Sequence, residues 1–250
     1  MAAFAKPGPI SEARSRPEEP SDNSEVSIIT IDSEEGLEIM RHTLTAQVLA
    51  RAVKNLHPDT KLAIGPTIAD GFYYDFEFKK AISPDDLASI EKEMKKIISN
   101  GSSITKTLHS KSDAINIFKG LNESYKESII SESEQDDNFQ LYYQDNNEFV
   151  DLCRGPHLPS LKHIGAFRLT KLAGAYWKGD SKNKMLTRIY GTAWKNEKEL
   201  NAYLLRIEEA EKRDHRKLGK EMNLFHFQEE APGMVFWHPN GWTIYRLFDS

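Results

Sequence analysis

The chain has 250 residues, of which 39% are apolar and 28% charged, so it can bury a sizeable core and is not disordered throughout. Its 33 basic and 38 acidic side chains give a net charge of −5, which excludes a chain-wide positive field that attracts nucleic acid. The single cysteine excludes a disulfide framework within the chain and suits a reducing compartment such as the cytoplasm.

The first 24 residues combine four of the eleven prolines with mixed charges and serines, and we interpret residues 1–24 as a disordered lead. They lack the apolar run of a secretory signal. No later stretch approaches the ~20 consecutive apolar residues that cross a bilayer, so we expect no membrane partner. The β-rich run Val26–Ile31 marks where order begins.

A long helix is predicted over Gly36–Leu56, because apolar residues recur there at every fourth position and form one stripe. His42 lies off that stripe. The segment Gly71–Phe78 alternates in its second half, which is typical of a strand with one face toward water. Another helix is expected to start at Ser83–Pro84 and to end at Asn100–Gly101.

The middle of the chain favours an α+β fold over a doubly wound α/β fold. Between Ser103 and Tyr190, short β-prone pieces alternate with polar turns and one brief helix near Asp113–Phe118. A second long amphipathic helix, which we interpret as a connector, is predicted from Asn196 to about Glu221. Residues 225–250 are rich in aromatics and stop without a helix cap, so we interpret them as the start of a larger body.

Cys153 and His157 stand four residues apart around Gly155–Pro156, where the backbone is not helical, so both side chains can face one site. A thiol and an imidazole at this spacing suit zinc ligation, or the histidine lowers the thiol pKa or positions a water. A buried cysteine beside a surface histidine also fits, because a second pair of metal ligands is missing.

Three further polar residues are ordinary when taken alone. His42 is typical of a solvated or hydrogen-bonded histidine on a polar helix face. Asp151 ends an acidic segment, and Lys126 fits a surface lysine. None of them indicates a site without additional information.

A local basic excess lies near the predicted connector helix. Residues 182–220 hold eleven Lys or Arg against six Asp or Glu. Arg213, Arg216 and Lys217 belong to the cluster at the end of that helix. They suit contacts to phosphates, or they offset the partial negative charge of the helix C-terminus.

Several motifs follow one another in a fixed order along the chain. They are Lys61–Pro66, Gly71–Asp75, Ser124–Lys126, Asp151–His157, Gly174–Asp180 and Arg188–Ala193, with Arg213–Gly219 and Pro232–His238 after them. In these motifs the chain resembles the second N-terminal, or editing, domain of the threonyl-tRNA synthetase family, which the alanyl enzymes share. The resemblance runs from about Val26 to Arg246, roughly nine-tenths of the chain.

The resemblance implies an α+β editing domain, in which a long helix packs on an antiparallel sheet, and an ester hydrolase activity. Its substrate would be serine wrongly attached to threonine tRNA. Serine lacks one methyl of threonine, and a site shaped for threonine rejects it by only about 1–3 kcal/mol, roughly 10–200-fold. A second, hydrolytic site fills that gap. A non-catalytic tRNA-binding remnant is the alternative function.

The resemblance also implies which residues act. His42, Lys126, Asp151, Cys153 and His157 would line the catalytic cleft; Tyr73, Tyr74 and Arg154 would bind substrate; Arg213, Arg216 and Lys217 would bind tRNA. A histidine or the thiolate would activate water, Lys126 would stabilise developing negative charge, and Asp151 would orient a partner.

The sequence departs from the family in its first helix. The family carries H-x-x-x-H there, whereas His42 is followed four positions on by Ala46, and a shift of one residue places Thr43 and Gln47 instead. We therefore expect no metal cofactor, with zinc held by His42, Cys153 and His157 as the alternative.

The resemblance divides the chain into a lead (1–24), the editing domain (25–195), a linker helix (196–224) and the start of a class II ligase core (225–250). ATP, Mg²⁺ and Zn²⁺ would belong to the rest of that core, so we do not expect this chain to activate threonine. The expected partner is seryl-charged threonine tRNA. The family enzyme is a homodimer, whereas we expect this chain to be monomeric because the dimer contacts lie mostly in the core.

Overall fold

The computed structural model describes residues 2–5, 26–145 and 148–248, and the chain divides into two units, residues 1–200 and 201–250. The expected disordered lead lies mostly outside the described residues. Within it, however, Ala2–Ala5 forms strand β1, which pairs antiparallel with β2, Val26–Ile29. No helix in the described ranges is long and apolar enough to cross a bilayer.

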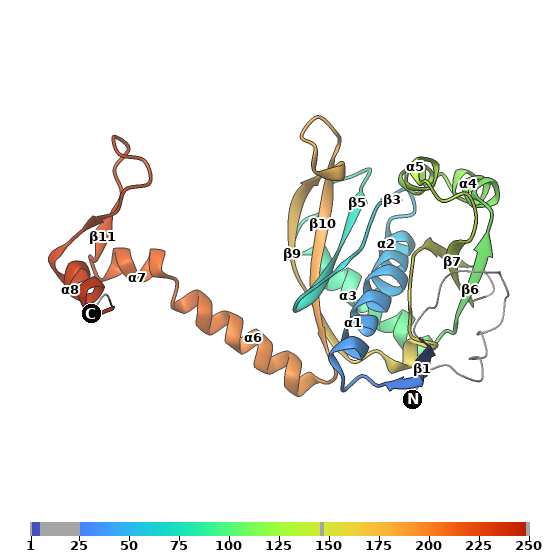
Figure 1. Ribbon diagram of the computed structural model, residues 1–250, viewed down its shortest axis with the longest axis horizontal. Helices are drawn as coiled ribbons and strands as arrows, with labels where there is room; N and C mark the ends of the chain where they lie inside the picture. The colour runs from blue at the N-terminus through green and yellow to red at the C-terminus, as the bar shows by residue number, and fades with distance from the viewer. Residues whose placement is uncertain (1, 6–25, 146–147, 249–250) are drawn as a thin grey trace. The chain divides into compact units, whose positions relative to one another are not determined.

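Two further antiparallel sheets build the first unit (Figure 1). The larger has the strand order β3-β5-β10-β9, with β4 also paired to β5, and the smaller has the order β6-β7-β8. The larger comprises β3 (Lys61–Leu62), β4 (Thr67–Ile68), β5 (Gly71–Glu77), β9 (Ala166–Tyr176) and β10 (Met185–Trp194). The smaller comprises β6 (Ile104–His109), β7 (Phe139–Gln144) and β8 (Phe149–Leu152). The α+β class predicted from the sequence is confirmed.

The predicted long helix lies between these two sheets (Figure 1). It runs through α1 (Glu34–Thr43), the π-helical segment η1 (Leu44–Leu49) and α2 (Ala50–Leu56). The apolar stripe packs on the large sheet in the main core, where Met40, Leu44 and Val48 are fully buried with Phe72 and Phe76. The predicted packing of helix on sheet is therefore correct.

The face of this helix away from the stripe is also buried, which the amphipathic pattern did not predict. Thr43, Thr45 and Gln47 are 0% exposed. On β7, Gln144 donates through Nε2 to the main-chain oxygen of Gln47 at 2.7 Å and to its Oε1 at 2.8 Å. The small sheet thus covers the polar side of the helix, and polar groups become enclosed where the two elements meet.

Three shorter helices follow in the first unit. Helix α3 (Asp86–Asn100) ends at Gly101, whose φ of 66° is the left-handed cap predicted there. Helix α4 (Lys111–Gly120) is the predicted brief helix. Helix α5 (Ser124–Glu132) was not predicted, because its only buried apolar residues are Tyr125 and Ile130 and give no helical period. The 3₁₀ turns η3 (Leu161–His163) and η4 (Trp177–Gly179) precede and follow β9.

The predicted connector helix is two helices, so the single helix from Asn196 to Glu221 was wrong. Helix α6 (Glu197–Lys212) and helix α7 (His215–Glu221) are separated at Arg213–Asp214. Asp214 accepts the backbone N–H of Arg216 at 2.8 Å and caps α7. The second unit also contains β11 (Phe225–His226), β12 (Phe236–Trp237) and α8 (Pro239–Phe248).

Candidate active site

The loop after β8 turns sharply at Gly155. Its φ is +63°, and a Cβ at this position would lie 2.0 Å from the Tyr142 hydroxyl, so glycine is the residue that fits without a shift. The Gly155 N–H donates to Cys153 Sγ at 3.4 Å. This turn allows Cys153 and His157, four residues apart, to face the end of α1.

Three side chains predicted to act together converge there. His42 Nε2 lies 2.8 Å from Cys153 Sγ. The rings of His42 and His157 stack in parallel, with 4.7 Å between centroids and 4° between planes. One ligand atom from each of the three residues lies within 4.8 Å of the others.

Burial decides the protonation of the Cys153–His42 pair. It raises the pKa of the Cys153 thiol to about 11, so the sulfur keeps its proton at neutral pH. Burial also lowers the pKa of His42, although the charges of Asp151 and Glu38 act the other way. The neutral thiol therefore donates to the neutral imidazole, and a histidine, not a thiolate, is the base available in this cluster.

His157 is 6% exposed, and its surroundings keep it neutral. Burial, followed by the neighbouring charge of His42, lowers the pKa of His157 well below 6.5. Its Nδ1 lies 3.3 Å from Thr43 Oγ1. The Tyr142 ring packs edge-on against the His157 ring, with 4.4 Å between the two ring centroids. Its Nε2 is buried without a hydrogen-bond partner among the described residues. A buried polar atom of this kind is costly unless it has a ligand or water to bind.

Lys126, Asp151 and Tyr74 form a second polar group beside the first. Lys126 Nζ lies 2.6 Å from Asp151 Oδ1, and the Tyr74 hydroxyl donates to Asp151 Oδ2 at 3.0 Å. Burial and then the charge of Asp151 raise the pKa of Tyr74 well above 10, so its phenol stays a donor. Because Asp151 also shifts the pKa values of His42 and Cys153, the two groups share one electrostatic site.

The candidate substrate-binding residues separate. Tyr74 joins the cluster, but Tyr73 lies on the opposite face of β5, where the Arg188 guanidinium is 3.7 Å from its ring centre. The strand alternation carried this signal, since Tyr74 shares its face with the buried Phe72 and Phe76. Arg154 is exposed, beside Cys153 in the chain.

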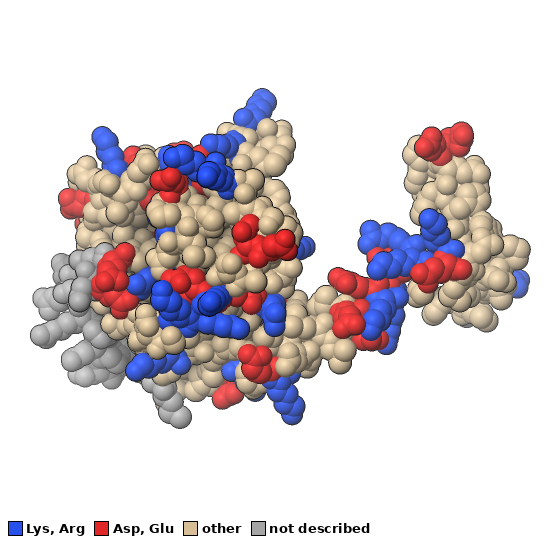
Figure 2. Space-filling model, turned by 180° about the vertical axis from the view of Figure 1, so that it is seen from behind, with Lys and Arg blue, Asp and Glu red and all other residues tan. Residues whose placement is uncertain are grey.

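The candidate tRNA-binding residues lie in the second unit. Arg213 Nη2 is 3.5 Å from Glu209, and Arg216 is held by Asp214 at 2.6 Å, whereas Lys217 is exposed. Figure 2 shows basic and acidic side chains intermixed over α6 and α7. The basic excess of this segment is therefore partly neutralised within it.

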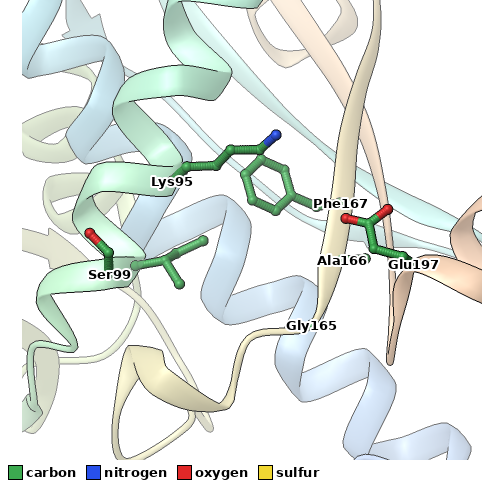
Figure 3. Close-up of a pocket in the computed structure, with 7 residues that line it drawn as sticks. Lys95, Ser99, Gly165, Ala166, Phe167 and Glu197 are labelled. Carbon is green, nitrogen blue, oxygen red and sulfur yellow. The ribbon is translucent and has the colours of Figure 1, made fainter.

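Among the cavities on the described part of the first unit, two have similar volumes. One of about 240 Å³ adjoins the cluster and is lined by Tyr142, His157 and Leu158, together with Ile104, Lys106, Pro156 and Pro159. The other, of about 230 Å³, lies between α3 and β9, with Lys95 and Phe167 on its walls (Figure 3). The second contains none of the cluster residues, whereas His157 lines the first.

The donor set of His42, Cys153 and His157 is one that zinc accepts in proteins. Its geometry is different, however. Two ligands of a tetrahedral zinc stand about 3.6 Å apart, given zinc–nitrogen and zinc–sulfur bonds of about 2.0 and 2.3 Å. The 2.8 Å between His42 Nε2 and Cys153 Sγ is a hydrogen-bonding distance. In this arrangement His42 and Cys153 form a thiol–imidazole pair, and no step below uses a metal.

Part of the chain matches a known protein family. Residues 140–190, which include Cys153 and His157, match the family described as "Threonyl and Alanyl tRNA synthetase second additional domain". Over 228 residues, 91% of the chain, it is 52% identical to the threonine–tRNA ligase of Prochlorococcus marinus (strain MIT 9211), of which the match covers 35%.

Two further relatives give the same picture. Over 219 residues, 88% of the chain, the identity to the threonine–tRNA ligase of Legionella pneumophila (strain Paris) is 56%, and 34% of that protein is covered. The threonine–tRNA ligase of Wolbachia pipientis is 52% identical over 228 residues, 91% of the chain and 36% of the relative. The chain thus spans about a third of the length of these curated relatives. Over about nine-tenths of its length the chain is similar to the threonine–tRNA ligases, and its residues 140–190 match the second additional domain of threonyl and alanyl tRNA synthetases.

Proposed function

We propose that the first unit hydrolyses serine wrongly esterified to threonine tRNA, as the editing part of a threonine–tRNA ligase. The observation that carries this proposal is the convergence of His42, Cys153 and His157 beside the cavity of about 240 Å³. The Nε2 atom of His157, which has no partner among the described residues, stands in this cluster and is the group that would take a proton from water. The similarity to threonine–tRNA ligases supports an aminoacyl ester as the substrate.

The reaction is a general-base hydrolysis. Water gives a proton to Nε2 of His157, and its oxygen forms a bond to the carbonyl carbon of the seryl ester. The bond from that carbon to the ribose oxygen then breaks, and the ribose oxygen takes up the proton. Serine and tRNA with a free terminal hydroxyl are the products, so atoms and charges balance without a cofactor.

The second polar group stabilises the charge that develops. Lys126 is held by Asp151 through one contact of 2.6 Å, which leaves other N–H donors of its ammonium for the carbonyl oxygen. Tyr74 is fixed by its own bond to Asp151. Asp151 thus orients both groups.

The remaining assignments extend the proposal. Arg213, Arg216 and Lys217 contact tRNA phosphates, Arg154 contacts the substrate from the exposed loop, and residues 196–224 link the editing domain to a ligase core that begins at 225–250. ATP, Mg²⁺ and Zn²⁺ act in that core. The protein works in the cytoplasm, where tRNA is charged.

The test is deacylation of seryl- and threonyl-charged threonine tRNA by the purified chain after dialysis against a chelator. We expect release of serine well above the spontaneous rate and little release of threonine. His157→Asn removes the base and lowers seryl release by about 100-fold. His163→Ala, which changes an exposed histidine outside the cluster, leaves it unchanged. Seryl release no faster than the spontaneous rate refutes the proposal, and tRNA binding without hydrolysis then identifies the non-catalytic alternative.

A further inference from the structure

The hydroxyl of Thr43 has three polar neighbours at the point where α1 ends. Thr43 is fully buried. Its Oγ1 lies 2.8 Å from the carbonyl oxygen of Ile39, 2.9 Å from the backbone nitrogen of Leu158 and 3.3 Å from Nδ1 of His157. The contact to His157 joins the central helix to the loop that follows β8.

The chemistry of these neighbours determines where the protons lie. The Leu158 N–H only donates, and the Ile39 carbonyl only accepts. The single hydroxyl proton of Thr43 points to the Ile39 carbonyl, because that contact, at 2.8 Å, is shorter than the 3.3 Å contact to His157. A threonine in a helix also commonly donates to the carbonyl four residues before it. Thr43 Oγ1 is then left with a lone pair toward His157, so Nδ1 of His157 carries the proton.

We propose that Thr43 is a positioning residue that holds His157 as the Nδ1–H tautomer. Which imidazole nitrogen is protonated is set by the hydrogen bond that the other one makes. With the proton on Nδ1, the lone pair of His157 is on Nε2, the buried atom that lacks a partner among the described residues. This inference rests on the proposed hydrolysis, because it explains how His157 can accept a proton from water.

Thr43 and Gln47, four residues apart on the central helix, bond different partners. Thr43 stands where the shifted comparison expects the first histidine of H-x-x-x-H, and Gln47 stands at the second position. Gln47 is engaged with Gln144 on β7, whereas Thr43 contacts the active histidine directly. Of these two residues, only Thr43 bonds His157.

The tautomer can be measured directly by long-range ¹H–¹⁵N NMR of the full chain with labelled histidine. The eight histidines allow assignment of His157 by comparison with His157→Asn. Thr43→Val removes the acceptor at nearly constant shape, and Thr43→Ser retains it. Thr45→Val is the matched control, since Thr45 is also fully buried on the same helix and its hydroxyl bonds Tyr73 O at 3.0 Å.

We expect His157 to show a protonated Nδ1 and a bare Nε2 in the wild type, in Thr43→Ser and in Thr45→Val. Thr43→Val should shift the Nε2 signal toward that of a protonated nitrogen and lower seryl-tRNA hydrolysis by about tenfold or more, while Thr43→Ser restores it to within about twofold. Wild-type protein with the proton on Nε2, or a Thr43→Val spectrum like that of the wild type, overturns the inference. The expected wild-type tautomer without hydrolysis refutes the proposed function alone.

Discussion

Cys153 Sγ lies 2.8 Å from Nε2 of His42, and burial keeps the proton of this pair on the sulfur by raising the thiol pKa to about 11. Reactive cysteines have the opposite property, because a lowered pKa makes them thiolates at neutral pH. Cys153 is therefore a hydrogen-bond donor that fixes the His42 ring, and the stacked ring of His157 is fixed in turn.

This protonation state predicts slow alkylation of the thiol. Cys153 is the only cysteine, so its reaction with iodoacetamide can be followed without interference. A pKa of about 11 in place of 9.0 leaves about 100-fold less thiolate at pH 7.5, so the native chain should react at least about 100-fold more slowly than the chain in urea. Native alkylation as fast as that of the unfolded chain would contradict a protonated, buried thiol.

The Lys126–Asp151 ion pair predicts a large stability effect. Both side chains are almost fully buried, at 4% and 2% exposed. Lys126→Met leaves Asp151 as an uncompensated buried charge, so the free energy of unfolding should fall by about 3–5 kcal/mol. Lys79→Met is the control, because it breaks an exposed pair with Asp59 and should cost less than about 1 kcal/mol. Denaturant titration measures both, and equal losses would show that the buried pair has no special role.

The turn at Gly155 predicts a loss of activity from a single added methyl. Gly155→Ala adds a Cβ that meets the Tyr142 hydroxyl at 2.0 Å, at a backbone φ of +63°, so we expect the loop to move and to carry Cys153 and His157 with it. Gly179→Ala has a similar backbone strain, with φ of +73°, but no atom within 4 Å of the added Cβ.

We expect Gly155→Ala to lower seryl-tRNA hydrolysis by up to about 100-fold, because a shift of about 1 Å in reacting groups has that effect. Gly179→Ala should remain as active as the wild type. Deacylation rates measured side by side give the comparison. A Gly155→Ala chain with wild-type hydrolysis would show that the loop tolerates the methyl and that its geometry is not critical.

The buried neutral histidine predicts a pH dependence of stability. The pKa of His157 is well below 6.5 in the folded chain and about 6.5 when unfolded, so the unfolded state binds more protons as the pH falls below 6.5. Stability is therefore complete above that pH and is lost below it, by at most about 1.4 kcal/mol per pH unit from this residue.

His157→Asn should reduce the slope of the free energy of unfolding against pH below pH 6.5. His163→Ala should retain that slope, because His157 is still present. Part of the slope should persist in His157→Asn, since burial also lowers the pKa of His42. Unfolding by urea at pH 7.5, 6.5 and 5.5 provides the measurement. An unchanged slope in His157→Asn would mean that the histidine is protonated in the folded chain.

The sequence predicted the elements that have a strong hydrophobic period. The central helix and α3 were located because their buried residues repeat regularly, as Leu87, Ile90, Met94 and Ile97 do. Helix α5 has no such repeat, and the break between α6 and α7 depends on one capping residue, Asp214, inside an otherwise periodic segment. Hydrophobic periodicity does not predict a helix that depends on tertiary contacts or a helix boundary that depends on a cap.

The site was predictable in part. The spacing of Cys153 and His157 indicated a shared site, but the approach of His42 depends on chain segments more than 100 positions apart, which only the resemblance suggested. Lys126 and Asp151 are of residue types found most often on surfaces. Lys126 lies on helix α5, which the pattern did not reveal, and pairs there with Asp151 of β8. The hydroxyl of Thr43 carried no sequence signal, because its role comes from its three neighbours.

The π-helical segment η1 affects which way the residues on either side of it face around the central helix. Residues four apart drift by about 40° around a regular α-helix, yet Met40, Leu44, Val48 and Ala52 all belong to the main core. The wider turn of Leu44–Leu49 compensates for this drift. Deleting one residue there would tighten the helix and rotate everything upstream, so that His42 and Thr43 would point away from the loop they serve. The number of residues in Leu44–Leu49 thus determines whether His42 and Thr43 face Cys153 and His157.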